Sequence, residues 1–374
     1  MLPALLIKER TTVATTISPH TTSEQLNARA TTMQAIVQDV YGSADVLRLE
    51  KVQKPEVGDD DVLVLVQAAG VHIGDWHVMT GEPRLMRIMG FGLRAPKARV
   101  RGMDVAGTVE SVGKNVTRFH PGDDVFGICN GSFAEYACAR SDKLAPKPTN
   151  LTFEQAAAVP TSACTALQAL RGPGEIKAGQ RVLINGASGG IGLFAVQIAK
   201  AFGAEATGVC STPKVEMVHA IGADHVIDYI QEDFTRSAQR YDLILDMVGN
   251  RSLSQLRRAL TPRGTLVLVG GEGGDRWIGA LSRSMQGLVV SPFVSQRLVP
   301  VLGAANTQDL EFLKELIEAG EVRPVIDRTF PLSEAADAVR YLNSGRARGK
   351  IVVGVRGATS VADGMTVAGL ASRN

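Results

Sequence analysis

The sequence INGASGGIG at residues 184–192 joins an apolar run, RVLI, to an amphipathic segment that ends at a glycine. Ala187, Gly189 and Gly192 occupy the small-residue positions of the pattern GxGxxG, with alanine in the first place. Small residues let a pyrophosphate approach backbone N–H groups at the positive end of a helix, and the last one lets helix and strand pack closely. The stretch therefore predicts a strand–turn–helix unit that binds a dinucleotide. An ordinary glycine-rich turn in another α/β fold is the competing interpretation.

The region after this turn alternates between strand-like and helix-like segments. Strands are expected at 205–210, 225–229, 241–249 and 265–271, and helices at 192–204, 213–223 and 252–264. Such alternation is typical of a doubly wound parallel sheet with helices on both faces.

The region before the turn has a different pattern. Short alternating strands, such as 62–71 and 105–113, are separated by glycine and proline, which indicates a mostly antiparallel, barrel-like domain. A helix is expected over 151–170. The segment from about residue 308 onward holds a helix and a final strand at 349–355, which we expect to return to this first domain.

We therefore expect an α/β protein of two domains. The expected organisation is a disordered, threonine-rich extension at 1–32, a β-rich catalytic domain at 33–156 and 304–356, a dinucleotide-binding domain at 157–303, and a loose tail at 357–374.

Composition limits the possible partners. The chain has 374 residues with 40 basic and 38 acidic side chains, so its net charge is only +2. This balance gives no electrostatic footprint for nucleic acid or an anionic membrane, and the mild basic cluster at 94–101 is expected to be a solvated loop. No apolar run of about 18 residues is present, so no membrane-spanning helix is expected.

Cysteine usage indicates a reducing compartment. The four cysteines form no CxxC pair and are widely spaced: Cys129, Cys138, Cys164 and Cys210. We expect a cytoplasmic protein, with an organellar presequence at the N-terminus as the less favoured alternative.

The cofactor's identity depends on the residues after the second strand of the parallel sheet. Proteins that bind NAD place a carboxylate there to hold the ribose 2′-hydroxyl. This chain instead has Cys210-Ser-Thr-Pro-Lys214, with two hydroxyl groups and one ammonium. Such a pocket suits a 2′-phosphate and predicts NADPH. A solvated Lys214 in a tolerant site is the alternative.

Several motifs occur in an order that carries a family resemblance: GVHIGDWHVMTG (70–81), RGMDVAGTVESVG (101–113), AAAVPTSACTALQAL (156–170), INGASGGIG and GKIVV (349–353). Together they resemble the medium-chain dehydrogenase/reductase superfamily, and within it the zinc-free quinone oxidoreductase and zeta-crystallin branch. The resemblance covers roughly residues 33–355. It implies a GroES-like catalytic domain, a Rossmann NADP-binding domain, a cleft between them, and a homodimer joined through the edge of the Rossmann sheet.

The resemblance also implies cofactor contacts at particular positions. Those contacts are His72, Thr165, Ala187, Ser188, Gly189, Gly190, Ile191, Ser211, Lys214, Tyr229, Gly270, Gly271 and Lys350. Only the phosphate turn and the pocket of Ser211 and Lys214 also have a separate argument from the residues themselves.

No metal site is expected. Zinc-containing relatives carry a cysteine in place of His72, a histidine in place of Met103, and a lobe with four closely spaced cysteines that this chain lacks. Catalytic zinc needs three protein ligands and an open position, and nothing in the spacing of Asp104 or Cys164 makes either a third ligand.

The histidines of GVHIGDWHVMTG are then expected to line the cleft. His72 is expected at the cofactor, and Asp75 at a turn or helix start, where it caps the backbone. For His77 three roles remain open, namely proton donor or substrate polariser, passive wall, and packed structural residue.

These expectations combine into a function. We expect NADPH-dependent, zinc-independent hydride transfer to a quinone, an enone or a related electrophilic carbonyl compound, with His77 stabilising the oxygen. A metal-free alcohol dehydrogenase or ketone reductase is one alternative. A weakly catalytic NADPH-binding sensor or interaction protein is the other.

The roles of two segments remain open. Residues 273–302 are apolar and helix-prone. The favoured interpretation is a buried helix followed by an edge strand, and the alternatives are a cleft wall, a subunit contact or a membrane-surface contact. The loop at 79–99 carries Met79, Met86, Met89 and Phe91, and is expected either to cover a bulky substrate or to pack on the barrel.

Overall fold

Six parallel strands form a twisted sheet in the order β10-β9-β8-β11-β12-β13. Their bounds are β8 (Arg181–Asn185), β9 (Glu205–Cys210), β10 (His225–Asp228), β11 (Tyr241–Asp246), β12 (Leu260–Leu268) and β13 (Arg297–Pro300). The strand order reverses between β8 and β11, which is the topological switch point at which such sheets bind ligands. The computed structural model describes residues 31–270, 277, 279, 281–301 and 303–356. The extension at 1–30 and the tail at 357–374 lie outside this range.

The second sheet has seven strands: six follow the order β14-β15-β3-β4-β5-β7, and β6 pairs with β3 off this path. Its strands are β3 (Asp61–Val71), β4 (Asp104–Val112), β5 (Asp124–Ile128), β6 (Tyr136–Arg140), β7 (Leu144–Pro146), β14 (Ile326–Pro331) and β15 (Lys350–Gly354). All pairings except β14–β15 are antiparallel. β15 lies beside β3, so a strand from residues 350–354 completes the sheet formed by residues 61–146. A separate hairpin pairs β1 (Thr32–Val37) with β2 (Arg48–Gln53).

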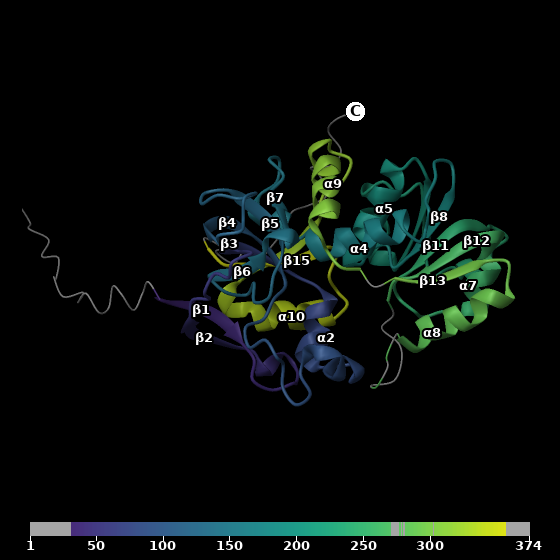
Figure 1. Cartoon of the computed structure of the whole chain (residues 1–374). Helices are drawn as coiled ribbons and strands as arrows, with labels where there is room; N and C mark the ends of the chain where they lie inside the picture. The colour runs from purple at the N-terminus through teal and green to yellow at the C-terminus, as the bar shows by residue number, and fades with distance from the viewer. Residues whose placement is uncertain (1–30, 271–276, 278, 280, 302, 357–374) are drawn as a thin grey trace, which may run out of the picture.

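Helices connect and cover the two sheets, as Figure 1 shows. They are α2 (Ile73–Thr80), α3 (Phe153–Ala157), α4 (Pro160–Arg171), α5 (Gly190–Ala201), α6 (Val215–Ala220), α7 (Leu253–Ala259), α8 (Leu281–Val290), α9 (Thr307–Glu318) and α10 (Ala335–Asn343). The α/β fold with one antiparallel and one Rossmann-type sheet is therefore confirmed.

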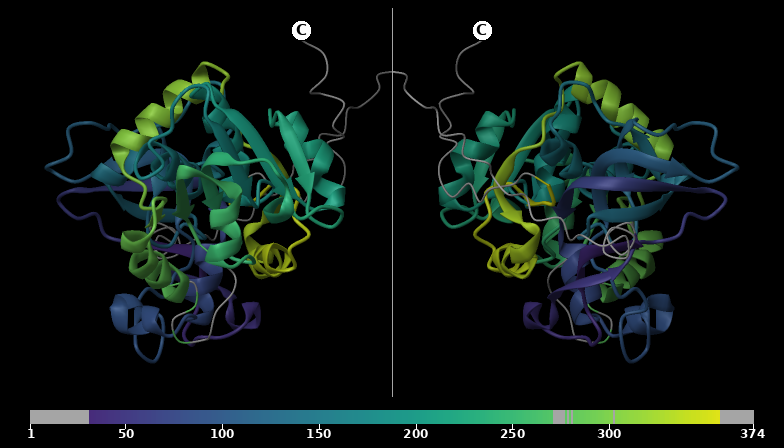
Figure 2. Two further views of the ribbon diagram at one scale, coloured as in Figure 1. Left: turned by 90° about the vertical axis from the view of Figure 1, so that its right-hand side faces the viewer. Right: turned by 90° about the vertical axis from the view of Figure 1, so that its left-hand side faces the viewer.

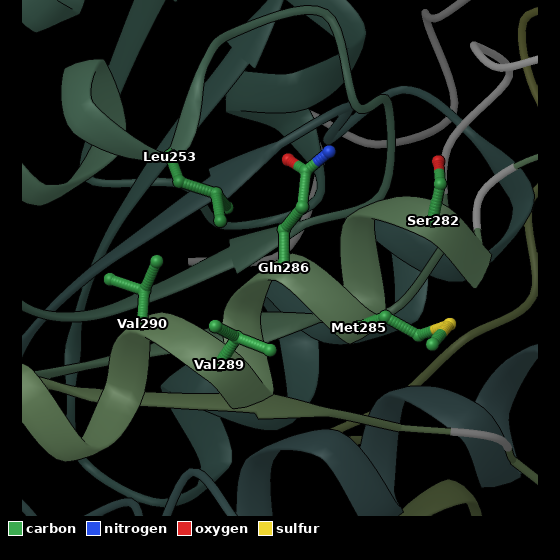
Figure 3. A pocket seen from close by; sticks show the side chains of 6 residues that line it. All are labelled: Leu253, Ser282, Met285, Gln286, Val289 and Val290. Atoms are coloured by element: carbon green, nitrogen blue, oxygen red, sulfur yellow. The ribbon is translucent and has the colours of Figure 1, made fainter.

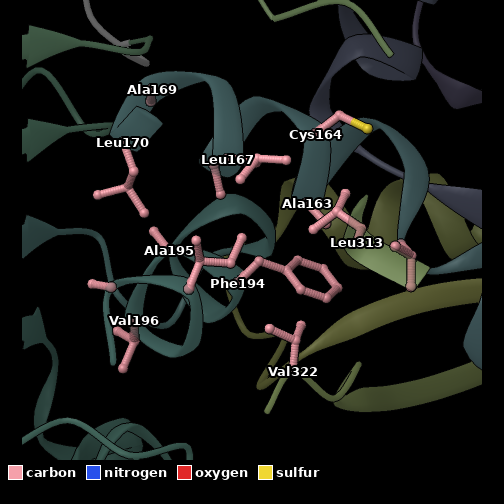
Figure 4. Close-up of a cluster of buried hydrophobic side chains, with 14 of the residues drawn as sticks. Ala163, Cys164, Leu167, Ala169, Leu170, Phe194, Ala195, Val196, Leu313 and Val322 are labelled. Atoms are coloured by element: carbon pink, nitrogen blue, oxygen red, sulfur yellow. The ribbon is translucent and has the colours of Figure 1, made fainter. Parts of the chain in front are cut away.

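One continuous apolar core joins the two sheets through α4. Leu167 and Leu170 of α4 and Phe194 of α5 are fully buried together with Leu313 of α9 (Figure 4). The same cluster includes Phe126 of the antiparallel sheet and strand residues of the parallel one. Burial of each large side chain of this kind stabilises the fold by roughly 1.5–3 kcal/mol.

Two predicted helices differ from the structure. The helix expected over 151–170 is divided into α3 and α4, because Pro160 has no N–H to donate and its ring starts a new helix at the first position. The helix expected over 252–264 ends at Ala259, and residues 260–264 already belong to β12. The sequence TPRG there contains proline and glycine, both poor at continuing a helix.

The close contact between α5 and the turn before it leaves no space for a side chain at Gly192, and this can be tested. A Cβ on this residue would lie 2.1 Å from the carbonyl oxygen of Gly186 and 2.7 Å from Cα of Ala187. Since both are backbone atoms, we expect Gly192→Ala to lower the free energy of unfolding by about 1–3 kcal/mol, measured by denaturant titration. Gly190→Ala is the matched control, because its nearest neighbour would be the flexible Ser162 hydroxyl at 3.3 Å. An equal loss in both variants would contradict the packing explanation.

Candidate active site

The phosphate turn has the geometry of an anion site. Gly186 has a φ of 96°, and the N–H of Gly189 donates to its carbonyl oxygen at 3.0 Å. α5 then begins at Gly190, and the first N–H groups of a helix have no partner within the helix. Together with the helix dipole these groups favour a bound phosphate. The cradle therefore fits the pyrophosphate of a dinucleotide.

The predicted residues of this turn divide into two groups. Ser188, Gly189, Gly190 and Ile191 are partly or fully exposed at the start of α5. Ala187 is fully buried, and its N–H donates to the carbonyl oxygen of Val209 at 3.0 Å. Ala187 thus packs the turn against the sheet, with its amide already in use, and is not placed as a phosphate ligand.

The residues predicted to hold a 2′-phosphate meet at the ends of β9 and β10. Tyr229 is exposed, and its N–H donates to the carbonyl oxygen of Cys210, next to Ser211. Lys214 Nζ donates to the carbonyl oxygen of Gly345 at 3.0 Å. Gly345 is followed by Arg346, an exposed cation whose Nε donates to the Ser344 hydroxyl at 3.2 Å. Sequence analysis did not link this residue to the pocket, because it lies 132 residues away from Lys214.

One carboxylate borders this pocket. Asp228 Oδ2 accepts a hydrogen bond from the Thr212 hydroxyl at 2.6 Å, and Oδ1 accepts from the N–H of Ile230. The Thr212 hydroxyl is the main cause that lowers the pKa of Asp228. The carboxylate therefore already has donors from its own neighbourhood.

A buried polar cluster lies where the antiparallel sheet meets α4 and α5. We define it as His72, Asp75, Asp104, Ser162 and Lys350, all of which are at most 6% exposed. Lys350 Nζ donates to Ser162 Oγ at 2.8 Å and to the carbonyl oxygen of Val71 at 3.4 Å. His72 Nε2 lies 3.8 Å from Asp104 Oδ1 and 3.7 Å from Asp75 Oδ2.

Burial shifts the ionisation of this cluster. Burial lowers the pKa of Lys350, and the charges of Asp104 and Asp75 oppose that shift. Burial raises the pKa of Asp104, opposed by His72 and Lys350. Among the described residues, His72 Nε2, Asp75 Oδ1 and Asp104 Oδ2 are buried without a hydrogen-bond partner. Unpaired buried polar atoms are costly, so this cluster is suited to receive a polar group of a bound molecule or water.

The cluster adjoins the phosphate turn. A Cβ on Gly190 would lie 3.5 Å from Lys350 Cδ, so the lysine side chain runs against the first turn of α5. Thr161, which sequence analysis did not single out, donates both its N–H and its hydroxyl to Asp104. Thr161 and Ser162 follow Pro160 in the sequence, and no pattern there indicates that they belong to a polar site.

α2 carries the two histidines of the motif at 70–81. His72 caps its start, where Nδ1 accepts from the N–H of Gly74, and Asp75 accepts from the N–H of His72 at 3.0 Å. The expected capping role of Asp75 is confirmed. His77 is half-buried one turn further, and its Nδ1 lies 2.9 Å from the carbonyl oxygen of Glu82. Because a carbonyl only accepts, Nδ1 carries the proton, and neutral His77 presents a lone pair at Nε2.

The remaining predicted cofactor residues are less open. Thr165 is buried, its hydroxyl donates to the carbonyl oxygen of Thr161 at 2.7 Å, and a Cβ on Gly303 would lie 2.3 Å from that hydroxyl. Gly270 follows β12, where a Cβ would be 3.6 Å from the carbonyl oxygen of Met247. Gly271 lies outside the described residues.

The described residues contain no group of three or more His, Cys, Asp or Glu side chains arranged to hold a metal ion. They also contain no helix long and apolar enough to cross a membrane.

A surface cavity lies elsewhere in the parallel-sheet region. About 490 Å³ lies between α7 and α8, open to the surface and lined mainly by apolar atoms (Figure 3). Its lining residues are Leu253, Ser282, Met285, Gln286, Val289 and Val290. None of the predicted site residues belongs to it.

Two family models match the chain. The alcohol dehydrogenase GroES-like domain matches residues 58–149, and the zinc-binding dehydrogenase model matches residues 221–353. The first range contains β3 to β7. The second contains β10 to β13 of the parallel sheet, together with β14 and nearly all of β15.

Full-length relatives extend the match. The chain is 34% identical to the mouse (Mus musculus) mitochondrial NAD(P)H oxidoreductase RTN4IP1, over 88% of this chain and 91% of the relative. It is 34% identical to the tomato (Solanum lycopersicum) 2-methylene-furan-3-one reductase, over 84% of this chain and 76% of the relative. The solved quinone oxidoreductase from Coxiella burnetii superposes with a TM-score of 0.76 at 31% identity, covering 87% of this chain and 100% of that one. The chain therefore belongs to the medium-chain dehydrogenase/reductase superfamily, in its quinone oxidoreductase-like branch.

Proposed function

We propose that this protein is a zinc-independent, NADPH-dependent reductase that transfers hydride to a quinone, an enone or a related electrophilic carbonyl compound. The observation that carries the proposal is the contact between the phosphate turn and the buried polar cluster, which places a dinucleotide cradle beside unpartnered polar atoms. The similarity to the tomato 2-methylene-furan-3-one reductase and to the Coxiella burnetii quinone oxidoreductase supports this acceptor class.

The preference for NADPH is supported by charge. The end of β9 carries Ser211 and Lys214 where NAD-binding proteins have a carboxylate, and Arg346 adds a second cation. Charge-assisted contacts to a phosphate are about twice as strong as neutral ones. We propose that the start of α5 holds the pyrophosphate while Lys214 and Arg346 hold the 2′-phosphate.

The cleft residues would then act on the acceptor. When bound, the reduced nicotinamide supplies a hydride to an electrophilic carbon. The acceptor's oxygen gains negative charge, which a positioned donor stabilises. His77 donates there only as the imidazolium, because its Nδ1–H is already committed to Glu82. Alternatively, neutral His77 holds a water through Nε2, and that water is the donor.

We also propose the domain limits, assembly and location. The catalytic domain would comprise 33–156 and 304–356, and the Rossmann domain 157–303.

In the described sheet β13 is an edge strand, paired only with β12, which supports a homodimer through this edge. Light scattering tests whether the protein is a dimer. The four free thiols support a cytoplasmic location, although the mouse relative is named mitochondrial. Imaging of the tagged full chain decides between these two locations.

The first experiment follows NADPH absorbance with quinones, enones, aldehydes and ketones, with and without a chelator. We expect turnover of quinones or enones that is indifferent to the chelator. Turnover of ketones alone would favour the ketone reductase, and chelator-sensitive turnover would overturn zinc independence. Tight NADPH binding without any turnover would favour a sensor.

Lys214→Ala tests the 2′-phosphate pocket. We expect the KM for NADPH to rise roughly ten- to hundredfold, because a hydrogen bond to a charged group contributes about 1.5–3 kcal/mol, while the KM for NADH stays unchanged. Lys177→Ala, which alters another exposed lysine of the parallel-sheet region, serves as the control. An equal rise for both cofactors would contradict the assignment.

His77→Ala tests the donor. We expect kcat to fall about a hundredfold and the pH profile of kcat to change, both measured with saturating NADPH and acceptor. His120→Ala alters a solvent-exposed histidine and should change neither quantity. If turnover and its pH profile were unchanged in the His77 variant, the donor role would be withdrawn.

A further inference from the structure

Large apolar side chains crowd one exposed loop after α2. Ile88, Met89, Phe91 and Leu93 are 68%, 66%, 41% and 69% exposed. We call residues 84–97 the apolar loop. Single exposed apolar residues are ordinary, but four within six positions form a concentrated patch of the kind that marks an interaction site. The expectation that this loop packs on the barrel is therefore wrong for these four side chains.

The backbone of the apolar loop is held in place, so the exposure is built into the fold. The Tyr41 hydroxyl lies 2.6 Å from the carbonyl oxygen of Gly92 and 3.0 Å from that of Phe91. Arg87 Nε donates to the carbonyl oxygen of Gly81 at 2.8 Å, and its guanidinium lies 4.3 Å from the centre of the Tyr41 ring. Figure 2 shows this part of the chain, in blue, projecting at the lower edge of the molecule in both views.

The charge around the patch has one sign. Residues 83–103 contain no Asp or Glu, although acidic and basic residues nearly balance over the whole chain. Arg84, Arg94 and Lys97 are exposed beside the apolar side chains. The nearby acids Asp39 and Glu50 are already paired with Arg99. The loop therefore presents apolar side chains surrounded by positive charge.

We propose that the apolar loop docks this protein on the surface of an anionic lipid bilayer. Apolar side chains enter the boundary between headgroups and acyl chains, and neighbouring cations are attracted to anionic headgroups. A second copy of the chain fits less well, because a twofold contact would set the same cations against each other. The expected solvated loop at 94–101 thus becomes the basic flank of a docking surface.

Docking has a consequence for the proposed function. α2 leads into the apolar loop, and the Glu82 carbonyl that holds His77 lies at the base of this loop. A bilayer at the loop would therefore lie next to the proposed cleft and would suit a lipophilic acceptor. This consequence rests on the proposed function, whereas docking does not.

Vesicle flotation of the full chain tests the proposal. The probes are vesicles of phosphatidylcholine alone and of phosphatidylcholine mixed with phosphatidylglycerol. We expect binding to the anionic vesicles only, weakened by salt. Arg94→Gln with Lys97→Gln should weaken it about 25-fold, which is roughly fivefold per cation. Ile88→Ser with Met89→Ser should weaken it further and leave the fold intact, as checked by thermal melting.

A matched control separates this surface from general stickiness. Val289 near the end of α8 and Phe293 just after this helix are 67% and 84% exposed, and the variant with serine at both should bind like the wild type. The proposal is overturned by absent binding, by equal binding to neutral vesicles, by loop variants that bind normally, or by loop variants that change only the oligomeric state. NADPH turnover measured without vesicles reports on the proposed function separately, since neither result depends on the other.

Discussion

A single buried ammonium connects the parts of this molecule on which its function depends. Lys350 is the first residue of the last described strand, and its Nζ reaches Ser162 at the start of α4 and the carbonyl oxygen of Val71 at the end of β3. Its stem lies against the first turn of α5. An ammonium that is almost fully removed from water is tolerated only with hydrogen bonds and opposite charge nearby, and here Asp104 and Asp75 supply that charge. The start of β15 is thereby held beside the phosphate turn.

The turn itself is restricted on its other side by close packing. Gly192 allows α5 to approach the backbone of Gly186, and the buried Ala187 seals the turn against β9. The start of α5 is thus packed against backbone at Gly192 and lies beside the Lys350 side chain at Gly190. Burial lowers the effective dielectric constant around this polar cluster, so a change of charge on a ligand bound there would have a larger effect than at the surface.

The outer surface is organised differently from this interior. The apolar loop is fixed by Tyr41 and Arg87, whose hydrogen bonds are all made to backbone carbonyl oxygens. The exposed apolar side chains of the loop take no part in these contacts and are therefore available for an interaction. α8 also carries exposed apolar side chains, namely Met285, Leu288 and Val289, so this helix is not buried as expected. The edge strand predicted after it is present as β13.

The sequence by itself determined the two sheets and the location of the phosphate turn. Both follow from local rules: alternation of strand and helix, glycine where backbone must approach backbone, and caps such as Asp75 that bond within three residues of their own position. Local pattern failed where a longer-range restraint acted. The amide of Ala187 is bonded to a neighbouring strand, and Leu260, expected within a helix, pairs with Tyr241 of β11. Only the tertiary structure decided that His72, Asp104, Ser162 and Lys350 share one buried cluster, and that Lys214 reaches the backbone of Gly345. These residues come from separate elements, and their proximity is set by the packing of α4 between the sheets, which no spacing in the sequence records.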